Sequence, residues 1–340
     1  MASLQSSVLI FPLLLGGMAI AQTSNPPQKV ISNGSIHAVL YLPNASNGYY
    51  RGTRFDWSGV IGSLQYGGHD YYGPWFTRTD PKVIDFIYNG PDIVAGPCSA
   101  ITGPVEEFST GGKGLGYDEA KAGGVFIKIG VGVLRRPDES GYNAFRLYEL
   151  VDGGKRSVRA KRDSIVFTQE LKDPGNGYAY VYVKTIRLVP GKPVMVIEHR
   201  LKNVGSRPIE TSVYDHNFLT LDKQPTGPDF TLSFPFSVTA DSSSRHNLLT
   251  TEQHRLLFRK LFTGRDTAFA TLTGFGTGQT DYHVTVENTK LKAGVKIQGD
   301  HPMAREHFWA IRSVLAIEPF IDLSIAPGQE TTWSYTYTYF

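Results

Sequence analysis

The stretch that decides the fold is residues 178–201, which read YAYVYVKTIRLVPGKPVMVIEHRL. Aromatic and aliphatic side chains alternate over residues 178–184, as they do in a β-strand whose two faces meet different surroundings. Residues 190–192, Pro-Gly-Lys, interrupt this pattern with residue types of a tight turn, and a second apolar run follows. We therefore predict two antiparallel strands that are joined by a hairpin.

Comparable strand-like runs, bounded by Gly, Pro, Asn or Asp, recur along the chain. They cover residues 35–42, 124–134, 164–171, 209–216, 230–238, 268–275, 282–287 and 306–317. The 18 Tyr and 19 Phe, against 4 Met, also favour strands over helices. Only residues 244–261 have a helix-like spacing of Leu and Phe, and we expect a helix there. The predicted fold class is all-β, a large two-layer antiparallel β-sandwich.

The first residues have the form of an export signal. Residues 8–20 are apolar but too few to span a bilayer, and residues 19–21, Ala-Ile-Ala, have the small-x-small pattern of a cleavage site. No internal repeat or linker divides the rest of the chain. We predict a signal peptide over residues 1–21, one domain over residues 22–340, and a secreted or periplasmic protein with no membrane span after cleavage.

The composition excludes several classes of function. The formal net charge is +3, from 34 basic and 31 acidic residues without long charged blocks, so nucleic acid is not an expected partner. Cys98 is the only cysteine, so no internal disulfide can form, and we expect this residue to be buried. The nine histidines are scattered, and the densest group, residues 301–307, lacks the spacing of a zinc site. We therefore expect no metal.

Two separate segments each place one titratable side chain at the end of an apolar strand-like run. His216 lies in residues 213–218, VYDHNF, and Glu318 lies in residues 315–319, LAIEP. The unperturbed pKa values of the two residue types bracket the range in which general acid–base catalysis works, so the pair could act as acid and base of one reaction. A solvated or hydrogen-bonded side chain would produce the same pattern, so the spacing leaves both interpretations open.

Three features of the C-terminal half resemble the aldose 1-epimerase (galactose mutarotase) family. They are the residues around His216, the Glu318-Pro319 pair, and residues 327–340, in which Pro-Gly-Gln-Glu precedes alternating Thr and Tyr. Residues 198–205, EHRLKNVG, look like the family's central strand and turn. The resemblance implies a large β-sandwich in which His216 acts as acid and Glu318 as base, with no cofactor. The family's usual Asn-Arg pair and His-Gly dipeptide are missing from the N-terminal third, which leaves the sugar unidentified.

Two aromatic and polar stretches, residues 49–57 and 67–75, have the composition of a sugar-binding site. Such sites pair aromatic faces, which cover the apolar side of a pyranose, with charged and polar groups that bind its hydroxyls. A surface loop with an Arg-Asp ion pair stacked on aromatic rings would have the same composition. The candidate substrate-binding residues of these stretches are Arg54, Trp57, His69 and Trp75.

Further candidates for substrate binding lie on the predicted strands. Glu107 belongs to a polar cluster that precedes one of them. Lys128 lies in an apolar run and points either into a pocket or to solvent. Asp215 and Asn217 flank His216, although neighbours in a strand face opposite sides of the sheet.

Together these residues predict an exported, carbohydrate-active protein whose partner is a sugar or oligosaccharide. The resemblance implies an aldose 1-epimerase-like isomerase, in which one side chain removes the proton of the anomeric hydroxyl while the other protonates the ring oxygen. Two alternatives remain open, because one fold hosts several chemistries. They are a non-catalytic carbohydrate-binding protein and a polysaccharide lyase-like enzyme on the same sandwich.

Overall fold

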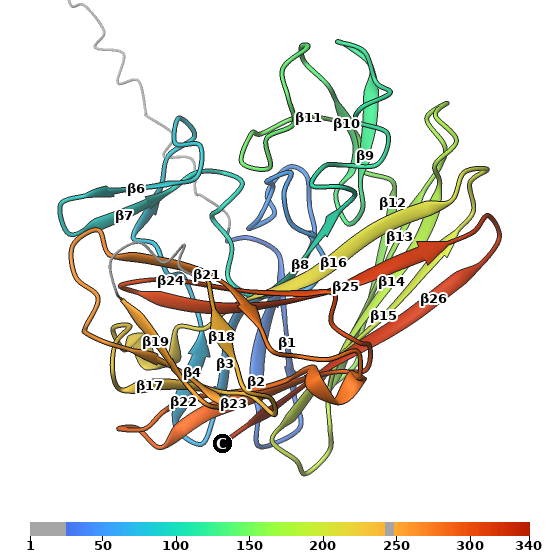
Figure 1. The fold of residues 1–340 in the computed structure, drawn as a ribbon. Helices are drawn as coiled ribbons and strands as arrows, with labels where there is room; N and C mark the ends of the chain where they lie inside the picture. Colours follow the sequence, from blue (N-terminus) through green and yellow to red (C-terminus); the bar gives the residue numbers. More distant parts are fainter. Residues whose placement is uncertain (1–24, 242–247) are drawn as a thin grey trace, which may run out of the picture.

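A computed structural model describes residues 25–241 and 248–340, and two large sheets dominate it (Figure 1). The ten-stranded sheet has the order β12 (Lys155–Ala160), β13 (Ser164–Leu171), β14 (Tyr180–Leu188), β15 (Val194–Asn203), β26 (Glu330–Tyr339), β23 (Ala293–Gly299), β22 (His283–Asn288), β17 (Phe230–Ser233), β20 (Arg255–Phe258) and β19 (Leu249–Glu252). The six-stranded sheet has the order β18 (Thr239–Ala240), β21 (Thr267–Thr273), β24 (Arg305–Ile311), β25 (Val314–Ile325), β16 (Ile209–Phe218) and β8 (Gly103–Ser109). Neighbouring strands are antiparallel in both sheets.

Three smaller sheets come from the N-terminal half of the chain. They consist of β1 (Gln28–Ser32), β2 (His37–Tyr41), β3 (Val60–Tyr66) and β4 (His69–Tyr72); of β9 (Val125–Lys128), β10 (Gly132–Arg135) and β11 (Glu149–Asp152); and of β5 (Arg78–Thr79), β7 (Asp92–Ala95) and β6 (Phe86–Asn89). The last of these sheets lies beside β21 and β24 (Figure 1). There the ring of Phe86 packs on Trp309, and the Tyr88 hydroxyl donates a hydrogen bond to the carbonyl of Asp266.

The main core lies between the two large sheets and is built by strand alternation. On β26 every second side chain is buried: Trp333, Tyr335, Tyr337 and Tyr339. These rings form one apolar cluster with inward-facing residues of the six-stranded sheet, such as Phe308. Burial of each large side chain stabilises the fold by about 1.5–3 kcal/mol. The predicted all-β class and antiparallel sandwich are confirmed.

The hairpin predicted from residues 178–201 is also confirmed. Strands β14 and β15 pair antiparallel over their length, and the Lys192 amide donates a hydrogen bond to the Val189 carbonyl at 3.1 Å in the turn between them. Cys98, as expected, is buried.

The helix expected at residues 244–261 is wrong where the structure describes it. Residues 249–258 form the β19–β20 hairpin, with Gln253 in the left-handed region at the turn (φ 51°). Leu256 and Phe258 are buried two residues apart, so the apolar spacing fits a half-buried strand. The start of this segment, residues 244–247, lies outside the described residues, as does the predicted signal peptide.

Helical structure in the described ranges is limited to two 3₁₀ turns, η1 (Leu221–Lys223) and η2 (Gln279–Asp281). No helix in this part of the chain is long and apolar enough to cross a membrane.

Candidate active site

Strand β16 presents different chemistry on its two faces. Tyr214, His216 and Phe218 point to the face turned away from the ten-stranded sheet, whereas Asp215 and Asn217 point to the inner face. The Tyr337 hydroxyl of β26 lies 2.6 Å from Asp215 Oδ2, which identifies the inner face. Because side chains alternate along a strand, one short segment contributes both to an outer site and to the core.

The pairing of β16 with β25 places His216 beside Glu318. Tyr214 pairs with Phe320, and the bridge between Leu219 and Leu315 continues the same register on the far side of His216. His216 Nε2 lies 3.1 Å from Glu318 Oε1, and both side chains are more than nine-tenths buried. Two residues far apart in sequence are thus in direct contact on one face of one sheet.

Aromatic rings hold the imidazole of His216 in place. It stacks on Phe218 with ring centroids 3.7 Å apart. Phe55 and Trp309 meet it edge-on at 5.8 Å and 5.6 Å. These contacts fix the ring orientation and exclude water from one side of the pair.

Burial sets the protonation state of the pair. It holds the pKa of His216 well below its usual range, and the positive charge of Arg54 lowers it further. Burial raises the pKa of Glu318 to about 8, against the opposing effect of Arg54. Near neutral pH both groups therefore favour their uncharged forms, and the pair together carries one exchangeable proton.

The pair lies at the wall of a cavity of about 270 Å³. This is close to the lower end of the range for small-molecule sites, roughly 300–1,000 Å³. The lining combines six aromatic rings with five polar or charged side chains. Its members are Arg54, Trp75, Asp85, Phe86, Ser99, Phe145, His216, Phe218, Phe269, Trp309 and Glu318.

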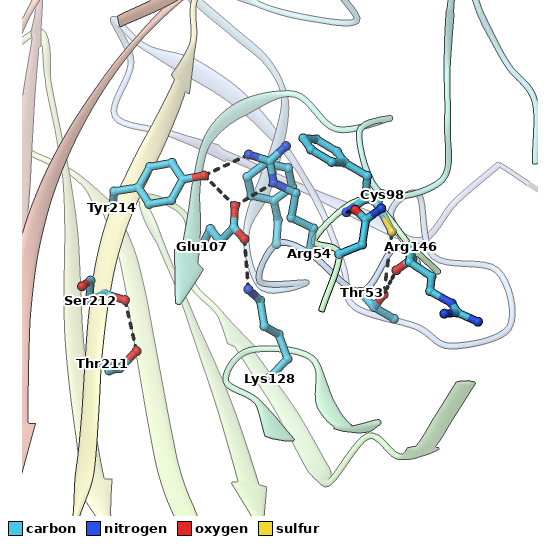
Figure 2. Close-up of polar contacts among 12 residues, drawn as sticks. Thr53, Arg54, Cys98, Glu107, Lys128, Arg146, Thr211, Ser212 and Tyr214 are labelled. Carbon is cyan, nitrogen blue, oxygen red and sulfur yellow. Dashed lines mark hydrogen bonds and ion pairs between the residues drawn. The ribbon is translucent and has the colours of Figure 1, made fainter. Parts of the chain in front are cut away.

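A buried ion-pair cluster includes Arg54, one of the residues that line the cavity. Figure 2 shows its contacts. Arg54 Nε is 2.6 Å from Glu107 Oε2, and Lys128 Nζ donates to Glu107 Oε1 at 3.0 Å. The Tyr214 hydroxyl accepts a hydrogen bond from Arg54 at 3.0 Å and donates one to Glu107 at 2.5 Å. Although burial opposes ionisation of Glu107, the charges of Arg54 and Lys128 outweigh it and bring its pKa to about 2. Glu107 is therefore a charged anchor that holds Arg54 at the cavity.

Comparison with known proteins defines the fold. No family model and no curated protein sequence matches the chain. A galactose mutarotase-like protein from Lactobacillus casei ATCC 334 is 12% identical, with a TM-score of 0.55 over 92% of this chain and 100% of that one. A galactose mutarotase related enzyme from Lactobacillus acidophilus is 14% identical, with a TM-score of 0.53 over 92% and 97%. The chain has the galactose mutarotase-like fold.

A third similar structure extends this likeness to animals. The aldose epimerase homologue from C. elegans is 13% identical and has a TM-score of 0.51 over 92% of this chain and 98% of that one. At such low identities the likeness establishes the mutarotase-like fold, and the chemistry has to be argued from the side chains.

Not all predicted site residues reach the cavity of this mutarotase-like sandwich. Arg54 and Trp75 line it together with His216 and Glu318. Trp57 is buried outside it, where its indole donates to the Gly52 carbonyl at 2.7 Å.

His69 also lies away from the cavity. It is bound to Asp222 at 2.6 Å and borders a separate surface hollow beside β3 and β4. The aromatic and polar composition of residues 49–75 thus serves several structural contacts besides the site.

The predicted substrate-binding residues that lie on strands of the sandwich have structural contacts and do not line the cavity. Lys128 is buried against Glu107, so it neither enters the cavity nor faces solvent. Asp215 and Asn217 are buried on the inner face, where the Tyr337 hydroxyl lies between them at 2.6 Å and 2.8 Å. We therefore do not retain Glu107, Lys128, Asp215 or Asn217 as residues that contact a sugar. Within the described ranges, no group of three or more His, Cys, Asp or Glu residues is arranged to hold a metal ion.

Sequence reasoning missed the cavity residues Asp85 and Ser99. Both come from the segment around β6 and β7, which carried no recognisable motif. It also missed a polar cluster on the inner face, formed by Glu106, Lys184 and His199. One signal was available for that cluster, because consecutive Glu106 and Glu107 in a strand must face opposite sides of the sheet.

Proposed function

We propose that this protein is an aldose 1-epimerase-like isomerase, in which Glu318 and His216 exchange protons with a sugar at its anomeric centre. The observation that carries the proposal is the 3.1 Å contact between His216 Nε2 and Glu318 Oε1 at the wall of an aromatic cavity. Two atoms this close can reach the anomeric hydroxyl and the ring oxygen of one pyranose, which are bonded to the same carbon. Similarity to mutarotase-like structures supports the proposal at the level of the fold.

The reaction needs two coupled proton transfers. Ionised Glu318 takes the proton of the anomeric hydroxyl while protonated His216 gives its proton to the ring oxygen, and the bond between C1 and the ring oxygen breaks. The aldehyde forms, and rotation about C1–C2 turns its other face to the hydroxyl. Glu318 then returns a proton to the carbonyl oxygen as His216 takes one back, and the ring closes to the other anomer.

The free enzyme holds the correct number of protons for this cycle. Ring opening leaves Glu318 protonated and His216 neutral. The uncharged pair of the free enzyme has this same protonation, which is the one needed for ring closure. Transfer of one proton from Glu318 to His216 gives the pattern needed for opening. Both patterns contain one exchangeable proton, so exchange with solvent is not required during a cycle. Each well-placed proton transfer contributes about 10²–10⁴-fold to the rate.

The direct test is Glu318→Gln with anomer exchange followed by polarimetry or NMR on freshly dissolved galactose and glucose. We expect kcat to fall by about 10²–10⁴-fold, because the amide cannot accept the proton. Sugar affinity should change little, since the amide keeps the shape of the carboxyl group. Glu306→Gln is a matched control: Glu306 lies on neighbouring β24, is buried, and also has a pKa raised to about 8 by burial, but it does not line the cavity.

Assays of the parent protein for anomer exchange, sugar binding and lyase activity separate the alternative functions. A parent protein that binds sugars but does not accelerate anomer exchange would be a carbohydrate-binding protein. Release of unsaturated sugars from a polysaccharide, detected by ultraviolet absorbance, would instead show lyase chemistry. Unchanged turnover in Glu318→Gln would refute the assigned base.

We also propose that the protein acts outside the cytoplasm, because residues 1–21 have the form of a signal peptide. Expression of the full chain followed by N-terminal sequencing of exported protein should find a chain that starts at Gln22. Protein that keeps its first residues and stays in the cytoplasm would contradict the proposal.

A further inference from the structure

Asp85 is a cavity residue that the proton-transfer scheme does not use. It lines the same cavity as His216 and Glu318 and is half-buried in the bend immediately before β6. The Ser99 hydroxyl donates a hydrogen bond to Asp85 Oδ1 at 2.6 Å. A carboxylate can accept about four hydrogen bonds, so this single contact leaves most of its capacity for a ligand.

Backbone contacts fix the position of this carboxylate. The Gly96 amide donates to the Asp85 carbonyl at 2.6 Å, and the Ser99 amide donates to the Gly96 carbonyl at 3.0 Å. The next residue, Phe86, packs edge-on against Trp75 and Trp309 at 5.7 Å and 5.9 Å. Asp85 is therefore held in place before any ligand arrives, and such preorganisation reduces the entropy lost on binding.

The charges around the cavity point to the kind of ligand. Arg54 is the one cation among the described lining residues, and it is already paired with Glu107 at 2.6 Å. Burial raises the pKa of Asp85 above its usual range, and the hydrogen bond from Ser99 and the positive charge of Arg54 oppose part of this rise. An ionised Asp85 would repel a ligand carboxylate and attract hydroxyl donors.

The aromatic residues show how the ligand would lie. Six of the eleven lining side chains are aromatic, and they can cover only the apolar C–H face of a sugar. After His216 and Glu318 are assigned to the anomeric centre, few polar side chains remain for the other hydroxyls. Asp85 is the strongest hydrogen-bond acceptor among them.

We propose that Asp85, held by Ser99, is the specificity-determining residue that accepts hydrogen bonds from hydroxyl groups of the sugar ring and selects uncharged sugars over uronic acids. This inference rests on the proposed function, because it places the anomeric carbon at His216 and Glu318. It adds a second point of attachment, which fixes the orientation of the ring relative to the acid and base.

Binding can be measured independently of turnover, because Trp75 and Trp309 line the cavity and their fluorescence should respond to a sugar. Titrations with galactose and glucose should give a Kd about 10- to 100-fold higher for Asp85→Ala than for the parent. Ser99→Ala should raise it less, about 2- to 10-fold, because the carboxylate remains but is no longer held. Asp92→Asn is the control, since Asp92 lies on the adjacent strand β7, half-exposed and outside the cavity.

Two ligand series make the test specific. Monodeoxy sugars that lack the hydroxyl bound by Asp85 should bind the parent and Asp85→Ala equally, whereas the other monodeoxy sugars should keep the difference. Asp85→Asn should bind galacturonate and glucuronate more tightly relative to the neutral sugars than the parent does, because a repelling charge has been removed.

The possible outcomes distinguish this inference from the proposed function. Equal affinities in parent, Asp85→Ala and Ser99→Ala, with unchanged melting temperatures, would overturn the inference even if anomer exchange were fast. Loss of affinity in these variants with no turnover in the parent would support the inference and refute the isomerase. If Asp85→Ala fails to fold, Asp85→Asn and Ser99→Ala decide the question.

Discussion

Two adjacent residues of one strand illustrate how alternation divides structural and chemical roles. His216 faces the cavity and contacts Glu318, whereas Asp215 faces the core and contacts Tyr337. A shift of one residue in the pairing of β16 would exchange the two faces and place the imidazole in the core. The many aromatic contacts of His216 and its neighbours therefore also define the register on which the candidate site depends.

The pKa values of the pair predict an unusual pH dependence of kcat/KM, which reports groups of the free enzyme. Above the Glu318 pKa of about 8 the pair loses its exchangeable proton, so a base remains but no acid, and the rate should fall as pH rises. Below the depressed pKa of His216 the pair gains a second proton and has no base, so the rate should fall only in clearly acidic solution.

Anomer exchange measured across pH, after subtraction of the uncatalysed rate, checks this prediction. The plateau should extend to about pH 8 and well below the ordinary histidine pKa of 6.5. The upper limb should persist in Glu306→Gln, because that carboxyl group lies outside the cavity. A decline that begins near pH 6.5 would show that His216 is not shielded as the structure indicates.

The Arg54–Glu107 pair joins an N-terminal loop to β8. The Arg54 guanidinium lies over the rings of Phe55 and Phe145 at 4.4 Å and 4.7 Å, and its Nε is 2.6 Å from Glu107 Oε2. Removal of one partner of a buried ion pair leaves the other uncompensated, which costs about 3 kcal/mol or more. Arg54→Ala should therefore lower stability as well as sugar binding.

Urea unfolding of three variants checks this role. Arg54→Ala should lose about 3 kcal/mol, because Lys128 then compensates only part of the buried Glu107 charge. Arg54→Ala combined with Glu107→Gln should not recover this loss, because the second change leaves the buried Lys128 without its carboxylate partner. Arg51 is the control, because it is exposed and its side chain donates a hydrogen bond to a backbone carbonyl, that of Ser46. The free energy of unfolding of Arg51→Ala should stay within about 0.5 kcal/mol of the parent value. Unchanged stability in Arg54→Ala would mean that Arg54 serves the ligand alone.

Elements defined by local patterns could be predicted from the sequence, and those that depend on distant pairing could not. The β14–β15 hairpin follows from alternation and a Pro-Gly turn inside residues 178–201. The β19–β20 hairpin was mistaken for a helix because its Leu and Phe spacing fits both periods, and the pairing with β17 decides between them. The site was only partly predictable: His216 and Glu318 resemble a family pattern, but Asp85 reaches the cavity through the tertiary arrangement of β6.

A buried polar network joins the two large sheets of the sandwich. Glu106 of β8 binds His199 of β15 at 2.6 Å and Lys184 of β14, and the Lys184 ammonium also donates to the Ser58 carbonyl at 3.0 Å. Burial opposes the charge of Lys184, but Glu106 and Asp56 outweigh it and raise its pKa. The network thus consists of compensated charges inside an apolar core, with partners from both layers of the sandwich.

This arrangement predicts that Lys184→Met destabilises the sandwich without changing the chemistry of the cavity. The substitution leaves Glu106 buried with only part of its compensation, so the free energy of unfolding should fall by about 3–5 kcal/mol. Lys184→Met combined with Glu106→Gln should recover part of this loss, because the unpaired carboxylate is removed. Lys155→Met, at an exposed lysine of β12 in the same sheet, should stay within about 0.5 kcal/mol of the parent.

Urea unfolding provides the stability values, and anomer exchange well below the melting temperature provides the activity of the folded fraction. Since Glu106 faces away from the cavity, kcat should be the same in Lys184→Met and the parent. A small loss of stability, equal to that of Lys155→Met, would show that water or rearrangement replaces the lost ammonium. A large fall in kcat at full folding would show instead that the network behind β8 and β16 positions Glu107 and His216, so that the two faces of the sheet act together.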